Sequence, residues 1–110
     1  MSAPDPDMTS VWEAVERSTT WLDAHHEPDD AEITMRLLKV TEEAGEVAQA
    51  WIGATGRNPR KGVTHGRDDV AAELADVVFS ALVAIRSLGL DPGAVLNEKA
   101  RALVARTRGG

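Results

Sequence analysis

The sequence has no cysteine, no tyrosine and only one phenylalanine. Without cysteine the chain has no disulfide framework and no thiolate metal site, which is typical of proteins in a reducing compartment such as the cytoplasm. No apolar run approaches the roughly 20 residues that cross a bilayer, and the N-terminus lacks a basic flank followed by an apolar segment. The sequence therefore predicts a soluble cytoplasmic protein with no membrane partner.

Positive charge is also scarce, because 12 Lys and Arg residues stand against 18 Asp and Glu residues, for a formal charge of −6. Broad binding to nucleic acid phosphates needs an excess of Lys and Arg, so nucleic acid is not an expected partner. The segment 53–67 reverses the sign: it has four glycines, four cationic residues and no acid. This pattern indicates either a solvated loop or an anion-binding loop, with Arg60 and Lys61 as candidate phosphate contacts.

What the sequence does contain is apolar residues at helical spacing, and 110 residues suffice for one modest core. Ser10 and Glu13 have the spacing of a capping box. The pattern predicts four helices: from about Val11 to His25, from a cap at Asp29 to about Ile52, from Asp68 or Asp69 to about Leu88, and from Asp91-Pro92 onward. The predicted fold is all-α, a four-helix bundle over residues 10–106, with a flexible N-terminal arm at 1–9 and a short basic tail at 107–110.

Two pairs of acids stand out, Glu43 with Glu46 and Glu73 with Asp76, each pair embedded in an apolar stretch. Residues three apart lie on one face of a helix, so each pair projects two carboxylates together, and Lys39 shares the face of Glu43. Buried carboxylates are costly without a cation. A single pair would more often be a solvated surface, but two pairs on adjacent helices favour a metal site.

The ligand types favour particular metals. Carboxylate oxygens suit Mg²⁺ or Mn²⁺ better than zinc or copper. A di-iron bundle places a histidine three residues after a glutamate, and none of the three histidines does so. The expected cofactor is therefore Mg²⁺, with Mn²⁺ as the alternative.

The acidic motif resembles a known family. Glu42-Glu43-Ala-Gly-Glu46, 26 further residues and Glu73-Leu-Ala-Asp76 are similar to the E-E-x-x-E…E-x-x-D signature of MazG-like all-α nucleoside triphosphate pyrophosphohydrolases. The resemblance extends over about residues 33–106. Lys99 and Arg106 match the ends of the family pattern K-x-x-x-N-x-x-R, but Leu103 stands where that pattern has asparagine.

This resemblance implies Mg²⁺-dependent hydrolysis of a nucleoside triphosphate to a monophosphate and pyrophosphate, in nucleotide pool control or housecleaning. It implies the metal ligands Glu43, Glu46, Glu73 and Asp76, and a homodimer or homotetramer with sites near the interface. Glu42 and Glu43 are the catalytic candidates. Glu42 lies about 100° from Glu43 around the helix, so support of a ligand, general base and exposed acid all stay open for it.

Candidate substrate contacts are the cations at positions 39, 60, 61, 99 and 106, and an aromatic side chain. Lys39, Lys99 and Arg106 are the candidates outside the loop. Trp12 or Trp21 could stack on a base, with Trp21 as the chosen candidate, although a tryptophan is more commonly part of a core. Two other classes of function stay open. One is a catalytically idle regulatory bundle that binds metal and nucleotide without turnover, and the other is a plain structural helical dimer, which Mg²⁺ would not stabilise.

Overall fold

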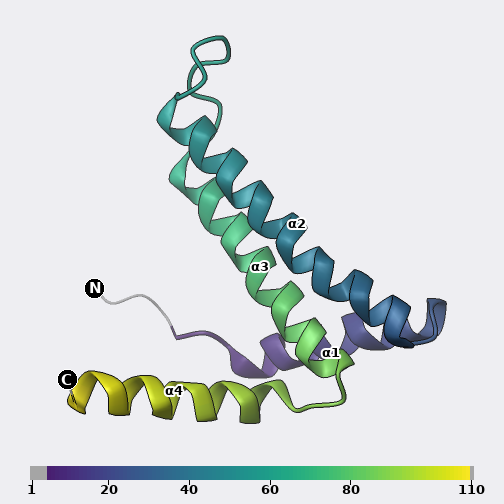
Figure 1. The fold of residues 1–110 in the computed structure, drawn as a ribbon. Helices are drawn as coiled ribbons and strands as arrows, with labels where there is room; N and C mark the ends of the chain where they lie inside the picture. Colours follow the sequence, from purple (N-terminus) through teal and green to yellow (C-terminus); the bar gives the residue numbers. More distant parts are fainter. Residues whose placement is uncertain (1–4, 110) are drawn as a thin grey trace.

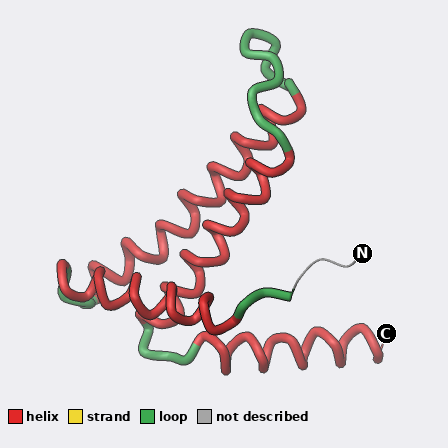
Figure 2. Tube along the Cα trace, turned by 180° about the vertical axis from the view of Figure 1, so that it is seen from behind, coloured by secondary structure: helices red, strands yellow, loops and turns green. Residues whose placement is uncertain are grey.

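The structure is a computed structural model that describes residues 5–109, and this range holds four α-helices and no strand (Figures 1 and 2). They are α1 (Met8–His25), α2 (Asp30–Thr55), α3 (Arg67–Ser87) and α4 (Pro92–Gly109). The prediction of an all-α, four-helix fold is confirmed. Residues 1–4 of the predicted arm and residue 110 of the predicted tail lie outside the described residues.

Two helix starts differ from those predicted. Asp7 caps α1, because its carboxylate accepts hydrogen bonds from two backbone N–H groups at 3.1 and 3.3 Å, so the capping box at Ser10 is wrong. Gly66 precedes α3 in place of Asp68. Asp69 takes part from inside the helix, where its Oδ2 accepts from the Gly66 N–H at 2.8 Å.

Other helix ends follow the expected chemistry. Asp29 caps α2 by accepting from a backbone N–H at 2.9 Å, and Asp91 accepts from the Gly93 N–H at 3.0 Å at the start of α4. Helix α2 runs to Thr55, three residues past its predicted end. It stops because Gly56 adopts the left-handed conformation with φ 65°, which costs glycine little.

Helices α2 and α3 form a long antiparallel hairpin, and α1 crosses its base and packs against α3 (Figure 1). Few apolar side chains of the described residues are buried, and most of them are small. They come from all three of these helices: Val15, Ala50, Leu82 and Ala84. A glycine inside a helix, such as Gly45 of the acidic motif, is often explained by close packing of a second helix, but beyond its own turn of α2 no atom lies within 4 Å of a Cβ placed there. The close-packing interpretation is wrong for Gly45 within this chain.

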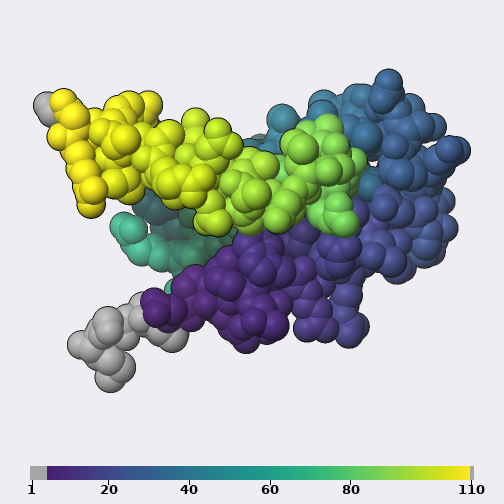
Figure 3. Space-filling model, turned by 90° about the horizontal axis from the view of Figure 1, so that it is seen from below, coloured from purple at the N-terminus to yellow at the C-terminus, as the bar shows by residue number. Residues whose placement is uncertain are grey.

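Helix α4 extends away from the hairpin, and Figure 3 shows open space between α4 and the start of α1. The radius of gyration is 16.9 Å, against about 13 Å for a compact chain of this length. Thr107–Gly109, the predicted tail, continues α4 as helix. Among the described residues, no helix combines the length and apolar character that crossing a membrane requires.

The loop between α2 and α3 folds back on the end of α2. The Gly53 carbonyl accepts hydrogen bonds from the N–H groups of Thr64 and His65 at 2.9 and 3.4 Å. A Cβ at residue 53 would collide with both of these side chains, at 2.5 Å from the Thr64 Oγ1 and closer still to the His65 Nδ1. Glycine at this position therefore lets the returning loop contact the helix.

Candidate metal centre and adjoining groove

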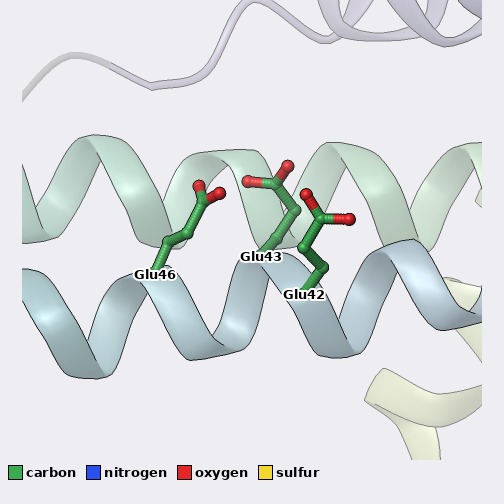
Figure 4. A group of neighbouring side chains, drawn as sticks. All are labelled: Glu42, Glu43 and Glu46. Atoms are coloured by element: carbon green, nitrogen blue, oxygen red, sulfur yellow. The ribbon is translucent and has the colours of Figure 1, made fainter.

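Five carboxylates gather midway along the α2–α3 hairpin. Glu42, Glu43 and Glu46 of α2 offer oxygens that lie within 4.8 Å of one another, and so do Glu43, Glu73 and Asp76. Figure 4 shows the three α2 side chains pointing to the same side of their helix. Glu43 belongs to both groups, so the structure brings together all four acids that we predicted as metal ligands.

The burial of these acids is uneven. Glu43 is 8 % exposed and lies at the centre, Glu46 and Glu73 are half-buried, and Glu42 and Asp76 are exposed. The Glu73 Oε2 atom is buried and has no hydrogen-bond partner. An acceptor that is buried and unpaired costs about 1–3 kcal/mol, and more when charged. A cation bound between the helices would remove this cost.

Lys39 is the basic side chain bonded to the cluster. Its Nζ lies 3.1 Å from the Glu43 Oε1 and 3.4 Å from the Glu42 Oε1, and these bonds, that to Glu43 foremost, raise the pKa of Lys39. The charge of Glu43, followed by burial and the neighbouring Glu73, raises the pKa of Glu46. One ammonium does not balance five carboxylates, so the metal-free cluster carries unrelieved repulsion.

This donor set fits a hard divalent cation. All five donors are carboxylate oxygens, which Mg²⁺ and Mn²⁺ accept, and the exposed acids leave room for water and phosphate oxygens to complete the coordination. Glu42 was expected to point away from Glu43, but its carboxylate lies within reach of the same ion and its Oε1 contacts Lys39. Glu42 is therefore part of the acidic cluster, although its side chain is exposed.

A groove of about 600 Å³ opens beside the acids, between α1, α2 and α3. Its size is within the usual range of small-molecule sites. The acidic end of its wall consists of Lys39, Glu42, Glu43 and Asp76. The remaining wall is mostly apolar and also includes two serines and one pair of charged residues: Leu22, Met35, Leu38, Phe79, Val83, Ser18, Ser80, Glu32 and Arg36.

A buried arginine that was not predicted as a site residue lies in the groove wall, away from the acidic cluster. Arg36 is 5 % exposed. Its Nε donates to Glu32 at 2.8 Å, and its Nη1 donates to Asp23 at 2.7 Å and to Ser87 Oγ at 3.0 Å, so it joins three helices. One feature of the sequence could have identified Arg36. It stands seven residues before Glu43 and therefore lies on the same side of α2.

The structure does not bring every predicted substrate contact to this site. Trp21 is 61 % exposed and stacks on His25 with ring centroids 4.1 Å apart, and it does not line the groove. Arg60 and Lys61 lie in the loop beyond the end of α2, about 18 Å of helix past Glu43. The remaining predicted contacts, Lys99 and Arg106, are exposed on α4 and do not line the groove.

The acidic cluster and the groove lie within the region that matches a known family. The family model for phosphoribosyl-ATP pyrophosphohydrolase matches residues 18–102. No significant match was found among curated proteins or among solved structures. The matched region contains both acidic pairs and the whole groove wall, and ends before Arg106. Because it covers most of the sequence, the chain belongs to the phosphoribosyl-ATP pyrophosphohydrolase family, within the broader MazG-like superfamily of nucleotide pyrophosphohydrolases.

Proposed function

We propose that this protein hydrolyses a nucleoside triphosphate between the α and β phosphorus atoms, in a reaction that depends on Mg²⁺ or Mn²⁺. The products would be a nucleoside monophosphate and pyrophosphate. The observation that carries this proposal is the position of Glu43 in two acid groups, one within α2 and one across to α3. Family membership supports the reaction class, a hydrolase that acts on acid anhydrides.

Different residues of the site would bind the metal ions, accept a proton and bind the phosphates. Glu43, Glu46, Glu73 and Asp76 would hold the ions, which neutralise the triphosphate and lower the pKa of a bound water. Glu42, which lines the groove next to these ligands, would accept a proton from the attacking water. Lys39, whose Nζ lies 3.1 Å from the Glu43 Oε1, would donate to a phosphate oxygen.

The family name raises a second substrate. Phosphoribosyl-ATP, the compound in that name, is itself a triphosphate, so the same ligands and the same bond cleavage would serve it. The matched region supports this substrate, and the groove volume alone does not separate it from ordinary nucleoside triphosphates.

A panel of ribo- and deoxynucleoside triphosphates together with phosphoribosyl-ATP, assayed with Mg²⁺ for pyrophosphate, tests the proposal. In ¹⁸O-water the label should enter the monophosphate if water attacks the α phosphorus, or pyrophosphate if it attacks the β phosphorus. Diphosphate and free phosphate as products would leave a metal-dependent hydrolase but exclude a pyrophosphohydrolase. Tight nucleotide binding with no turnover of any substrate would favour the idle regulatory bundle.

We also propose that the protein works as a homodimer or homotetramer. The α2–α3 hairpin has a second, uncovered face that does not line the groove, formed by Leu37, Trp51, Leu74 and Val78, and each of these is at least 44 % exposed. Arg67 of α3 lies over the Trp51 ring of α2, 5.3 Å from its centroid, so both helices contribute to this face. A second copy would shield these apolar side chains from water.

A further inference from the structure

We infer that the groove is the nucleoside subsite of this enzyme and that Arg36 determines which base it accepts. The inference rests on the proposed function, because the acidic cluster must hold the phosphates. It assigns to Arg36 a contact with the ligand, in addition to its contacts with three helices. The base would be identified by a hydrogen-bond acceptor, such as a ring nitrogen or carbonyl oxygen on its outer edge.

The groove has two chemically different ends. Its acidic end lies at Glu43 and Asp76, and Arg36 lies seven residues earlier in α2, which is about 10 Å along the helix. This separation is comparable with that between the far edge of a nucleobase and the 5′-phosphate. A nucleotide whose phosphates lie at the acids would therefore extend its base along the groove towards Arg36.

The wall between the two ends suits a flat, apolar ring. Phe79 follows Asp76 by three residues and lines the groove on the α3 side, and Leu22 lines it on the α1 side. An aromatic ring provides a stacking surface that every base accepts, worth about 1–3 kcal/mol per stacked base. Phe79 takes the stacking role that the sequence analysis gave to Trp21.

Arg36 keeps one pair of donors unused. Its Nε and Nη1 donate to Glu32, Asp23 and Ser87, whereas its buried Nη2 has no partner. A guanidinium remains charged at any physiological pH, so it cannot avoid the cost of an unpaired donor by losing a proton. A purely structural ion pair would gain stability by pairing these donors as well.

A base acceptor would supply the missing partner. Nη2 is covered in the unliganded protein, so its contact requires neighbouring groove side chains to change rotamer on binding, a common event at binding sites. Glu32, which also lines the groove, accepts from Arg36 through one oxygen. Its second oxygen can accept from an amino or imino group of the same base.

The test uses two pairs of variants and measures binding in Mn²⁺ by calorimetry. Ser18→Trp fills the groove from α1, and Thr20→Trp is its control on an exposed α1 position outside the groove. Arg36→Lys keeps the charge but removes Nη2, and Arg17→Lys is the control at an exposed arginine. The ligands are the α,β-methylene analogues of ATP, GTP, CTP and UTP, whose α–β linkage is not hydrolysed, and base-free tripolyphosphate.

We expect Ser18→Trp to weaken nucleotide binding at least tenfold without changing tripolyphosphate binding, and Thr20→Trp to change neither. Arg36→Lys should reduce the affinity ratio between the best and worst base at least fivefold. Equal effects of the two tryptophan variants, with pyrophosphate still released by the wild type, would overturn the inference and leave the proposed function intact. If the variants show the expected binding pattern but the wild type turns over no substrate, the nucleoside subsite would stand and the proposed hydrolysis would be wrong. A folded Arg36→Lys with an unchanged affinity ratio would exclude Arg36 from base selection. If Arg36→Lys fails to fold, Glu32→Gln alters the acceptor bonded to Arg36 in the groove and is measured for the same affinity ratio.

Discussion

The groove face and the uncovered face of the α2–α3 hairpin reverse the usual distribution of residues. On the groove face two charged side chains are buried, Arg36 at 5 % and Glu43 at 8 % exposure. On the uncovered face large apolar side chains are exposed, such as Leu74 at 50 % and Val78 at 54 %. Buried charge without full compensation indicates a binding site, and an exposed apolar surface indicates a contact with another molecule. The hairpin thus has a candidate reaction site on one face and a candidate assembly surface on the other.

The largest effect should come from removing a ligand on the groove face. Asp76→Asn is expected to lower kcat by orders of magnitude while nucleotide binding falls less, because the loss concerns the ions that act in the transition state. Steady-state pyrophosphate release and equilibrium binding measure the two quantities. Asp68→Asn, at the exposed start of α3, is the control. If Asp76→Asn kept the wild-type kcat, Asp76 would not be a metal ligand that catalysis requires.

A large effect is also expected on stability. Mg²⁺ that binds only the folded protein should raise the free energy of unfolding, by about 2.7 kcal/mol at a hundred times the dissociation constant. Glu46→Gln should remove most of this gain and, because it relieves repulsion from Glu43, stabilise the metal-free protein. Thermal melts with and without metal show both changes, with Glu98→Gln on α4 as control. A wild-type melt indifferent to millimolar Mg²⁺ and Mn²⁺ would contradict the metal centre.

On the uncovered face the expected effect is on assembly. Val78→Lys should shift the protein towards the monomer, because burial of an apolar side chain of this size contributes about 1.5–3 kcal/mol. Sedimentation velocity over a range of concentrations measures the shift. Val63→Lys, in the loop at 72 % exposure, is the matched control. A wild-type protein that stays monomeric at all concentrations would show that the face has another partner or none.

The smallest effect should come from the basic loop. Arg60 and Lys61 lie about 18 Å of helix beyond Glu43, so alanine at both should leave KM for the nucleotide nearly unchanged in an isolated protomer. The measurement is KM at protein concentrations below and above any assembly transition. A rise in KM confined to the assembled protein would mean that the loop of another copy reaches the acids, which would join the two faces in one function.

The helices and the acidic pairs could be predicted because both follow from residues close together in the sequence. Spacing of three and seven residues predicts which carboxylates share a helix face, and helix ends were placed within about three residues. The groove was not predictable, because Arg36 meets Asp23 and Ser87, which are 13 and 51 residues away in the chain. The positions of Lys99 and Arg106 failed to follow from their motif for a similar reason: the direction of α4 depends on few tertiary contacts.

Glu43 belongs to both groups of acids, and this affects which insertions the loop between α2 and α3 can accept. An ion bound by Glu43 and by the α3 acids would be a cross-link that closes the chain between Glu43 and Glu73. Such a closure fixes the register of the two helices independently of the segment that connects their ends. Because the cost of a longer closed segment grows only slowly, the connecting loop should accept insertions near its tip while the metal preserves the alignment of the hairpin. Chelation would remove this cross-link and leave the alignment of the hairpin to the packing of α2 against α3.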